Sequence, residues 1–229
     1  MITKQRLYNV IAKDLISYEI SSIPTDQSVN RALELMEDCK CSHVAVVDND
    51  VYQGIVSEEQ MLDIENPEAK IGSLKLQMIK PCVKSDAHIY QVIGAVNEFS
   101  VSCIPVLDDE NNFAGVISLQ NLAKNFAQIT NVNDPGGILI LEVKNKDYSL
   151  AQAAQIVESD NAKILSSYIY SNGSSDTLDL VLKINKKDLS TIMSAFDRYD
   201  YIIRDSYHES KFEQDMQGRY DQFMNYLNM

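Results

Sequence analysis

The hydrophobic and polar positions of this chain run through one order of elements twice. Each copy begins with a short extended piece and continues with a helix that has one apolar face. Two apolar strands around a polar turn and a second helix follow. The apolar helix faces are Val29, Ala32, Leu33 and Met36 in the first copy and Ile89, Val92, Ile93 and Val96 in the second. The strand pairs cover 44–47 with 52–56, and 104–107 with 113–117. This pattern predicts a duplicated βαββα unit, with two copies of one surface.

Polar residues before the helices predict where the helices begin. Thr25-Asp26 and Ser85-Asp86 precede the two apolar faces, and their side chains are expected to accept hydrogen bonds from the first backbone N–H groups. Ser57-Glu58-Glu59-Gln60 has the capping-box pattern at the start of the next helix. A short helix is also expected over residues 1–15, with Leu7, Val10, Ile11 and Leu15 on one face.

A linker rich in Asn, Pro and Gly, residues 129–136, precedes a different hydrophobic rhythm. Strands are expected at 138–143, 164–170, 177–184 and 201–203, with helices around 150–157 and 189–196. This order, βαββαβ, is typical of a ferredoxin-like domain over residues 137–204. Residues 205–229 carry apolar side chains at helical spacing and are expected to form a C-terminal helix.

Charge and composition narrow the classes of partner. The chain has 33 Asp and Glu against 20 Lys and Arg, a net charge of −13, which repels nucleic-acid phosphates and anionic lipid. Neither nucleic acid nor a membrane is therefore an expected partner, and no run of about 18 apolar residues or secretory leader is evident. The four cysteines form no CxxC pair, so reduced thiols and a cytoplasmic location are expected.

The sequence offers no familiar catalytic or metal-binding pattern. It contains no P-loop, nucleophile elbow, dinucleotide-binding glycine motif or cluster of metal ligands. We therefore assign no catalytic residue and no metal ligand, and we do not expect an enzyme.

Two short motifs give the repeat a family resemblance. Ser42-His43-Val44-Ala45-Val46 precedes Gly54-Ile55-Val56-Ser57, and Ser102-Cys103-Ile104-Pro105-Val106 precedes Gly115-Val116-Ile117-Ser118. With these motifs, residues 1–128 resemble a tandem pair of cystathionine-β-synthase (CBS) domains, with repeats at about 15–63 and 74–124. Residues 137–204 resemble an ACT domain, and the whole chain resembles the acetoin-utilisation proteins. The resemblance implies a mixed α+β protein, in which the CBS pair is followed by a ferredoxin-like domain and a C-terminal helix.

The resemblance also implies a regulatory, ligand-sensing module. CBS pairs commonly bind adenosine compounds in two clefts, so AMP, ADP, ATP, NAD or S-adenosylmethionine is expected as a regulatory ligand, with no required cofactor. A homodimer that signals to a separate protein target is expected. In the family pattern, the first cleft corresponds to Ser42, His43, Val44 and Ser57, with Gln60 at the ribose position. The second corresponds to Ser102, Cys103, Ile104, Pro105 and Ser118, with Asn121 at the ribose position.

The same residues leave a second interpretation open, a structural or interaction protein whose sites are degenerate. Neither ribose position carries the acid of the family pattern, and an amide binds a diol more weakly than a carboxylate does. Glu58 and Glu59 bring negative charge to the phosphate side of the first cleft, whereas the second has no acid there and has Lys124 one turn further on. In the ACT-like part, Tyr148 occupies the region of the usual glycine, which favours a dimerising sheet over an amino-acid site.

Overall fold

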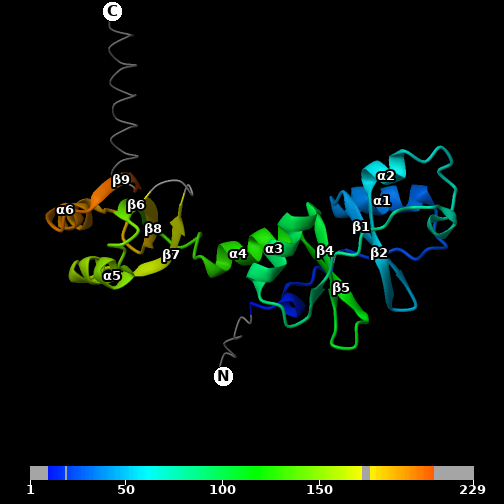
Figure 1. Cartoon of the computed structure of the whole chain (residues 1–229), viewed down its shortest axis with the longest axis horizontal. Helices are drawn as coiled ribbons and strands as arrows, with labels where there is room; N and C mark the ends of the chain where they lie inside the picture. The colour runs from blue at the N-terminus through cyan, green and yellow to red at the C-terminus, as the bar shows by residue number, and fades with distance from the viewer. Residues whose placement is uncertain (1–9, 19, 172–175, 209–229) are drawn as a thin grey trace, which may run out of the picture. The chain divides into compact units, whose positions relative to one another are not determined.

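The computed structural model describes residues 10–18, 20–171 and 176–208, and the chain divides into two compact units, residues 1–126 and 127–229 (Figure 1). The first unit contains the duplicated pattern, and the second contains the different rhythm. Residues 1–9 of the helix expected over 1–15, and residues 209–229 of the C-terminal helix expected over 205–229, lie outside the described residues.

The first unit confirms the repeated order of elements. In the first copy, helix α1 (Val29–Cys39) precedes strands β1 (His43–Asp48) and β2 (Val51–Ser57), helix α2 (Glu58–Leu62) and the short 3₁₀ helix η2 (Ile71–Ser73). The second copy has β3 (Val83–Lys84), α3 (Ile89–Phe99), β4 (Cys103–Leu107), β5 (Phe113–Ser118) and α4 (Leu119–Ile129). The pairs β1–β2 and β4–β5 are antiparallel, with a register irregularity at equivalent places, Val46/Val47 and Val106/Leu107.

A glycine sits at the same place in both hairpins for the same steric reason. Gly54 lies opposite Val46, and Gly115 lies opposite Val106. Their φ angles are +152° and +151°, a region that favours glycine. A Cβ at Gly54 would lie 2.8 Å from Met78 Cβ, and one at Gly115 would lie 2.6 Å from Ile16 Cγ2. The repeated glycines therefore allow a linker segment to pass closely over each hairpin.

The segment before each copy pairs with the other copy. Near the N-terminus, Ala12 N donates to Ala87 O (2.8 Å) and Ser17 N donates to Val116 O (2.8 Å), both in the second copy. The linker before the second copy behaves in the same way, because Gly72 N donates to Thr25 O (2.8 Å) in the first. The two copies are thus interlocked through exchanged linkers.

This exchange corrects the expected N-terminal helix. Val10 accepts from Ile89 N, and Ile11 forms a β-bridge with His88, so both residues are extended. Among the described residues of this segment, the only helical turn is the 3₁₀ helix η1 (Ala12–Leu15). The apolar spacing at Val10, Ile11 and Leu15 resembles a helix face, but these residues belong to a segment that pairs with the second repeat.

Two of the expected helix caps are also wrong. Ser28, not Thr25, caps α1, with Ser28 Oγ accepting from Arg31 N (3.2 Å). Thr25 instead belongs to a turn, because its N–H donates to Asp48 Oδ1 (2.9 Å). His88 rather than Ser85 caps α3, through Nδ1 and Tyr90 N (3.2 Å). The capping box that begins at Ser57 is confirmed.

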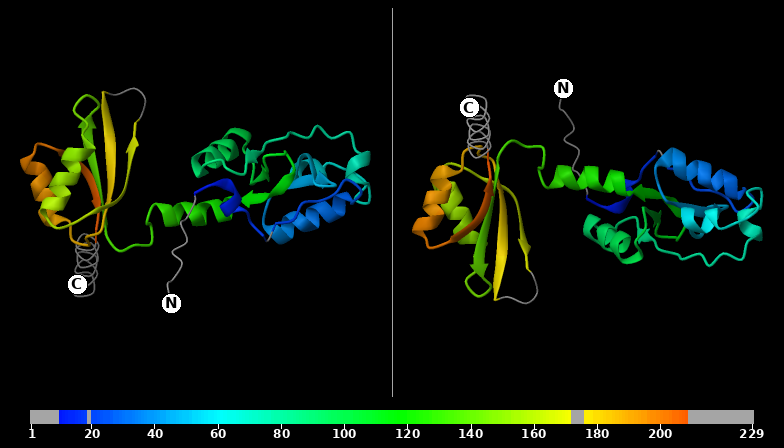
Figure 2. Two further views of the ribbon diagram at one scale, coloured as in Figure 1. Left: turned by 90° about the horizontal axis from the view of Figure 1, so that it is seen from below. Right: turned by 90° about the horizontal axis from the view of Figure 1, so that it is seen from above.

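The second unit confirms the βαββαβ order. Its elements are β6 (Gly137–Lys144), α5 (Leu150–Ser159), β7 (Ile164–Tyr170), β8 (Thr177–Ile184), α6 (Ser190–Arg198) and β9 (Ile202–Tyr207). They form an antiparallel sheet in the order β7-β8-β6-β9, with both helices on one face (Figure 2). Leu139, Leu141, Leu180, Leu182 and Phe196 fill the core between sheet and helices. The last strand continues to Tyr207, beyond the expected end at residue 203.

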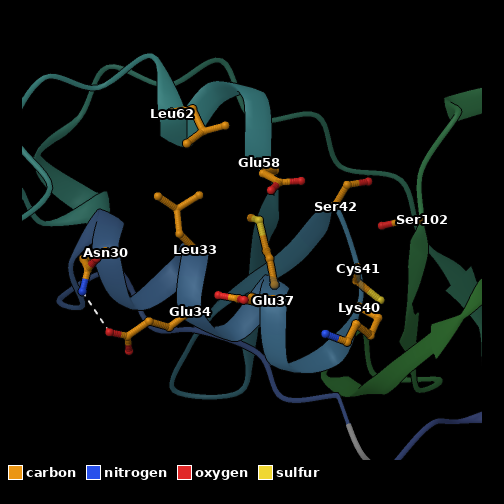
Figure 3. A pocket seen from close by; sticks show the side chains of 11 residues that line it. Asn30, Leu33, Glu34, Glu37, Lys40, Cys41, Ser42, Glu58, Leu62 and Ser102 are labelled. Atoms are coloured by element: carbon orange, nitrogen blue, oxygen red, sulfur yellow. Dashed lines mark hydrogen bonds between the residues drawn. The ribbon is translucent and has the colours of Figure 1, made fainter.

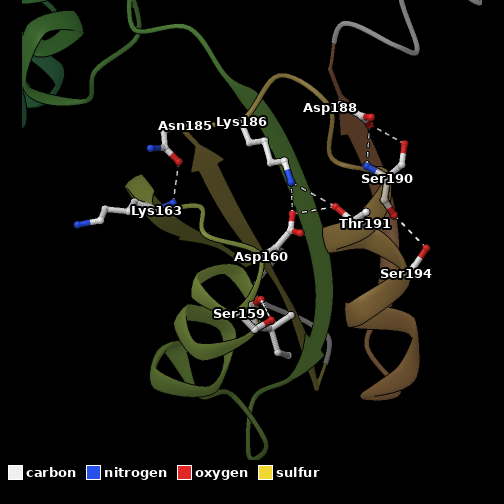
Figure 4. A network of polar contacts seen from close by, with 10 residues as sticks. Ser159, Asp160, Lys163, Asn185, Lys186, Asp188, Ser190, Thr191 and Ser194 are labelled. Atoms are coloured by element: carbon white, nitrogen blue, oxygen red, sulfur yellow. Dashed lines mark hydrogen bonds and ion pairs between the residues drawn. The ribbon is translucent and has the colours of Figure 1, made fainter.

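A polar network ties the end of α5 to the start of α6 (Figure 4). Thr191 Oγ1 donates to Asp160 Oδ2 (2.7 Å), and Lys186 forms an ion pair with the same carboxylate. The hydrogen bonds from Lys186 and Thr191 hold the pKa of Asp160 below its usual value. Tyr148, in the loop after β6, packs against the core of this unit.

Candidate functional site

A cavity of about 490 Å³ opens where the N-terminal linker meets both repeats. We call it the linker cavity. Three segments line it: the linker itself, the end of α1 in the first repeat, and the start of α4 in the second. Its lining residues are Ile16, Ser17, Tyr18, Ile20, Asp38, Cys39, Lys40, Ser118, Gln120, Asn121 and Lys124. The cavity therefore exists only because the linker crosses from one repeat to the other.

Ser118 and Asn121 fix the linker at one wall of this cavity. Ser118 is only 6% exposed, its Oγ accepts from Asn121 N (3.1 Å) as a helix cap, and it lies 3.1 Å from Ser17 Oγ. Asn121 Nδ2 donates to Leu15 O (2.6 Å), and its Oδ1 accepts from Asn125 Nδ2 (3.2 Å). The amide of Asn121 is therefore already engaged by the linker and by α4.

Positive charge reaches the cavity from both repeats. Lys40 and Lys124 line the cavity together with a single acid, Asp38, in a chain whose net charge is −13. Lys40 is the C-cap of α1 and adopts the left-handed conformation (φ 53°), which costs a non-glycine residue free energy. Tyr18, which also lines the cavity, is 96% exposed. A basic, partly aromatic cavity of this kind suits an anionic ligand with a flat ring.

In the first repeat, the counterparts of Ser118 and Asn121 are Ser57 and Gln60, and both are engaged in hydrogen bonds within the protein. Ser57 Oγ accepts from Gln60 N (3.1 Å), and Gln60 Oε1 accepts from Ser57 N (3.0 Å). Gln60 Nε2 also donates to Gln77 O (3.4 Å), so it contacts its linker as Asn121 contacts Leu15. Glu58 and Glu59 are exposed beside this cap.

The strand motifs of the two repeats meet at a polar seam rather than in the linker cavity. His43 Nδ1 accepts from Ser102 N (3.2 Å) and lies 3.2 Å from both Ser42 Oγ and Ser102 Oγ. Because Nδ1 is an acceptor, the ring proton of the neutral form is on Nε2. Burial lowers the pKa of His43, which favours this neutral ring.

A second cavity, of about 650 Å³, lies between α1 and α2 beside the seam (Figure 3). We call it the acidic groove. Glu34, Glu37 and Glu58 bring carboxylates to it, with Lys40 at its edge. Ser42, Cys41 and Ser102 line the end nearest the second repeat. This charge distribution does not suit a phosphorylated ligand.

The residues expected for each cleft are therefore only partly brought together. Ser118 and Asn121 share the linker cavity, but Cys103, Ile104 and Pro105 are buried in strand β4 and do not line it. Ser102 lies in the acidic groove with Ser42, from the other predicted cleft. Val44 is buried, and Ser57 and Gln60 line neither the linker cavity nor the acidic groove.

The sequence prediction took each cleft from one repeat, whereas the lining of the linker cavity comes from both repeats. The linker cavity combines the helix start of the second repeat with the segment just before Ser42 in the first. Lys40, Ser17 and Tyr18 were not predicted as site residues. The left-handed position of Lys40 has a twin at Ser100 (φ 52°), so alignment of the two copies indicates an equivalent helix end. The alignment of the two copies does not indicate which helix start lies across the cavity from the helix end at Lys40.

The described residues contain neither a membrane-spanning helix nor a cluster of metal ligands. No helix there is long and apolar enough to cross a membrane. No three or more His, Cys, Asp or Glu side chains in the described part of the chain are grouped to hold a metal ion.

Both copies of the duplicated unit match a known protein family. The family model of the CBS domain matches residues 12–65 and 72–128. Inosine-5'-monophosphate dehydrogenase of Methanocaldococcus jannaschii is 23% identical over 150 residues, which cover 65% of this chain and 30% of that protein. The chain thus corresponds to less than a third of the length of this curated relative.

Two solved structures match about half of this chain. A CBS domain pair/ACT domain protein from Thermotoga maritima has a TM-score of 0.47 and 18% identity, covering 52% of this chain and 97% of that one. CBSX2 in complex with AMP has a TM-score of 0.45 and 19% identity, covering 52% of this chain and 97% of that one.

Proposed function

Because this chain belongs to the proteins that carry a tandem pair of CBS domains, we propose that it is a regulatory module that binds an adenosine nucleotide or a related adenosyl compound. The observation that carries the proposal is the linker cavity, in which two lysines from different repeats face one small-molecule space. Its volume of about 490 Å³ lies within the usual range of small-ligand sites.

In the proposed complex, the chain's own groups divide the recognition. Lys40 and Lys124 pair with the phosphates, and Tyr18 stacks on the base. Ser118 and Asn121 hold the linker in place, because both are engaged in hydrogen bonds with it. Asn121 thus acts as a positioning residue in this proposal, not as a direct substitute for the acid of the family pattern.

The proposed output is a change in the relation between the two repeats. A ligand that contacts Lys40 on α1 and Lys124 on α4 favours the arrangement in which both reach it, and so shifts a population of conformations. The chain is proposed to act as a homodimer that passes this state to a separate protein. The ACT-like unit is proposed to extend the dimer through its sheet.

Calorimetry on the whole chain tests the proposal with AMP, ADP, ATP, NAD, S-adenosylmethionine and cyclic di-AMP. Replacing Lys124 by alanine removes one exposed charge contact, worth about 1 kcal/mol, so the dissociation constant should rise about fivefold. Lys75→Ala, which changes another exposed lysine outside the cavity, should leave the dissociation constant unchanged. If none of the six compounds gives heat or a thermal shift, the proposal is wrong.

A second candidate is a ligand-free interaction module, and one specific observation favours it. The amides of both predicted ribose positions, Gln60 and Asn121, contact linker carbonyl oxygens. On this alternative, the polar groups of both copies serve only to fasten the linkers. Native mass spectrometry of freshly purified protein distinguishes the two, since a retained nucleotide excludes the ligand-free module.

A further inference from the structure

Two cysteines from different repeats meet at the polar seam. Cys41 lies just before β1, and Cys103 is the first residue of β4. Cys103 Sγ lies 3.4 Å from His43 O, two residues after Cys41. Cys41 lines the acidic groove together with Ser102, the residue before Cys103, and both cysteines belong to one buried cluster. Both are free thiols, with exposed fractions of 8% for Cys41 and 0% for Cys103.

The seam makes the two thiols chemically unequal. Hydrogen bonds from Cys103 and Ser102 to its sulfur outweigh burial and lower the pKa of Cys41 to about 7. The proximity of Cys41 and burial raise the pKa of Cys103. Near neutral pH, Cys41 therefore supplies the nucleophilic thiolate, while Cys103 keeps its proton.

We propose that Cys41 and Cys103 are an oxidation-sensitive pair whose disulfide fastens the first repeat to the second. The oxidant is a peroxide. The Cys41 thiolate attacks one peroxide oxygen, the O–O bond breaks, and Cys41 becomes a sulfenic acid as water leaves after taking up a proton. The Cys103 sulfur then attacks the Cys41 sulfur, the S–O bond breaks, and the oxygen leaves as a second water with the Cys103 proton. The two thiols together lose two electrons, and the peroxide gains two.

Access to the pair selects the oxidant by charge. Cys41 lines the acidic groove, to which Glu34, Glu37 and Glu58 also bring carboxylates (Figure 3). These carboxylates repel anionic oxidants and anionic thiols such as glutathione, whereas a neutral peroxide meets no such barrier. Cys103 itself is fully buried.

The disulfide would act on the linker cavity, and this second step rests on the proposed function. Cys41 directly follows Lys40, and Cys103 pairs across the hairpin with Ser118. A disulfide brings the two sulfurs to about 2 Å, so the segments that carry opposite walls of the cavity are drawn together. We expect this narrowing to weaken nucleotide binding about fivefold, the low end for coupled sites.

Tryptic mapping of the oxidised full chain tests the disulfide without any ligand. Cleavage after Lys40 separates Cys39 from Cys41, which lies on peptide 41–70, while Cys103 lies on peptide 85–124. Hydrogen peroxide should join these two peptides, and a reductant should release them. Recovery of both peptides unlinked, or with Cys41 joined mainly to Cys39 or Cys82, would overturn the proposal.

Variants and binding measurements then separate the two steps. Cys41→Ser and Cys103→Ala should each abolish the linked peptides, whereas Cys82→Ser, at an exposed position, should leave them. The wild-type map decides the disulfide even if a variant fails to fold. Equal nucleotide affinity of oxidised and reduced protein would overturn the coupling. Absence of binding in both states would reject both the coupling and the proposed function, while the peptide map still decides the disulfide.

Discussion

Substitution of Gly54 by alanine tests the close passage of a linker over the first hairpin. The new Cβ would lie 2.8 Å from Met78 Cβ and 3.0 Å from Ile79 O, and neither atom is the free end of a flexible side chain. The φ angle of +152° adds backbone strain for any residue with a Cβ. Strain and overpacking together should lower the free energy of unfolding by about 3 kcal/mol.

Thermal unfolding of the whole chain measures this effect. For a unit of this size, about 3 kcal/mol corresponds to a fall of roughly 10 °C in Tm. The matched control is Gly94→Ala, in the middle of α3, where a Cβ meets no atom within 4 Å. That substitution should raise the stability by about 0.5–1 kcal/mol through helix propensity. If both variants shift Tm in the same direction, the explanation of the repeated glycine is refuted.

Three further predictions concern single positions in the first unit. Lys40→Gly and Ser100→Gly should each raise the free energy of unfolding, measured in urea, by about 1 kcal/mol, because glycine adopts the left-handed conformation without strain. Calorimetry should show weaker nucleotide binding only for Lys40→Gly. Burial lowers the pKa of His43, so the unfolded chain binds a proton first as the pH falls. The free energy of unfolding should therefore drop as the pH falls below about 6.5, and urea titrations of His43→Asn should lack this part of the slope. Ser28→Ala should lower the free energy of unfolding by about 1 kcal/mol because it removes a helix cap, whereas Thr25→Ala should leave it nearly unchanged. The reverse order would support the cap expected from sequence.

Much of the fold could be predicted from sequence because its signals are local. The apolar spacing from Val29 to Met36 and the alternation from Thr177 to Ile184 each report the face that an element buries. Both elements lie where they were expected. The cap of α1 was missed because Thr25 and Ser28 are both acceptable caps, and the choice depends on Asp48, which lies 23 residues away from Thr25.

The linker cavity was harder to predict because its walls are distant in sequence. Ser118 and Asn121 were identified through their motif. Lys40 faces them only because the two repeats interlock, and nothing between residues 40 and 118 encodes that pairing locally. Ser17 and Tyr18 directly follow residues 1–15, whose apolar spacing suggested a helix. The partners of an extended linker depend on tertiary contacts rather than on its own periodicity.

The two copies of the unit have diverged in opposite electrostatic directions. At the start of α2, a helix of only five residues, the carboxylates of Glu58 and Glu59 offset the positive end of the helix dipole. At the start of α4, eleven residues long, no acid is present in the first turn, and Lys124 adds a positive charge to the cavity. Both copies nevertheless keep an amide that contacts a linker carbonyl, at Gln60 and Asn121. Contact with a linker carbonyl is thus shared by the two helix starts, whereas only the start of α4 is free of acids in its first turn.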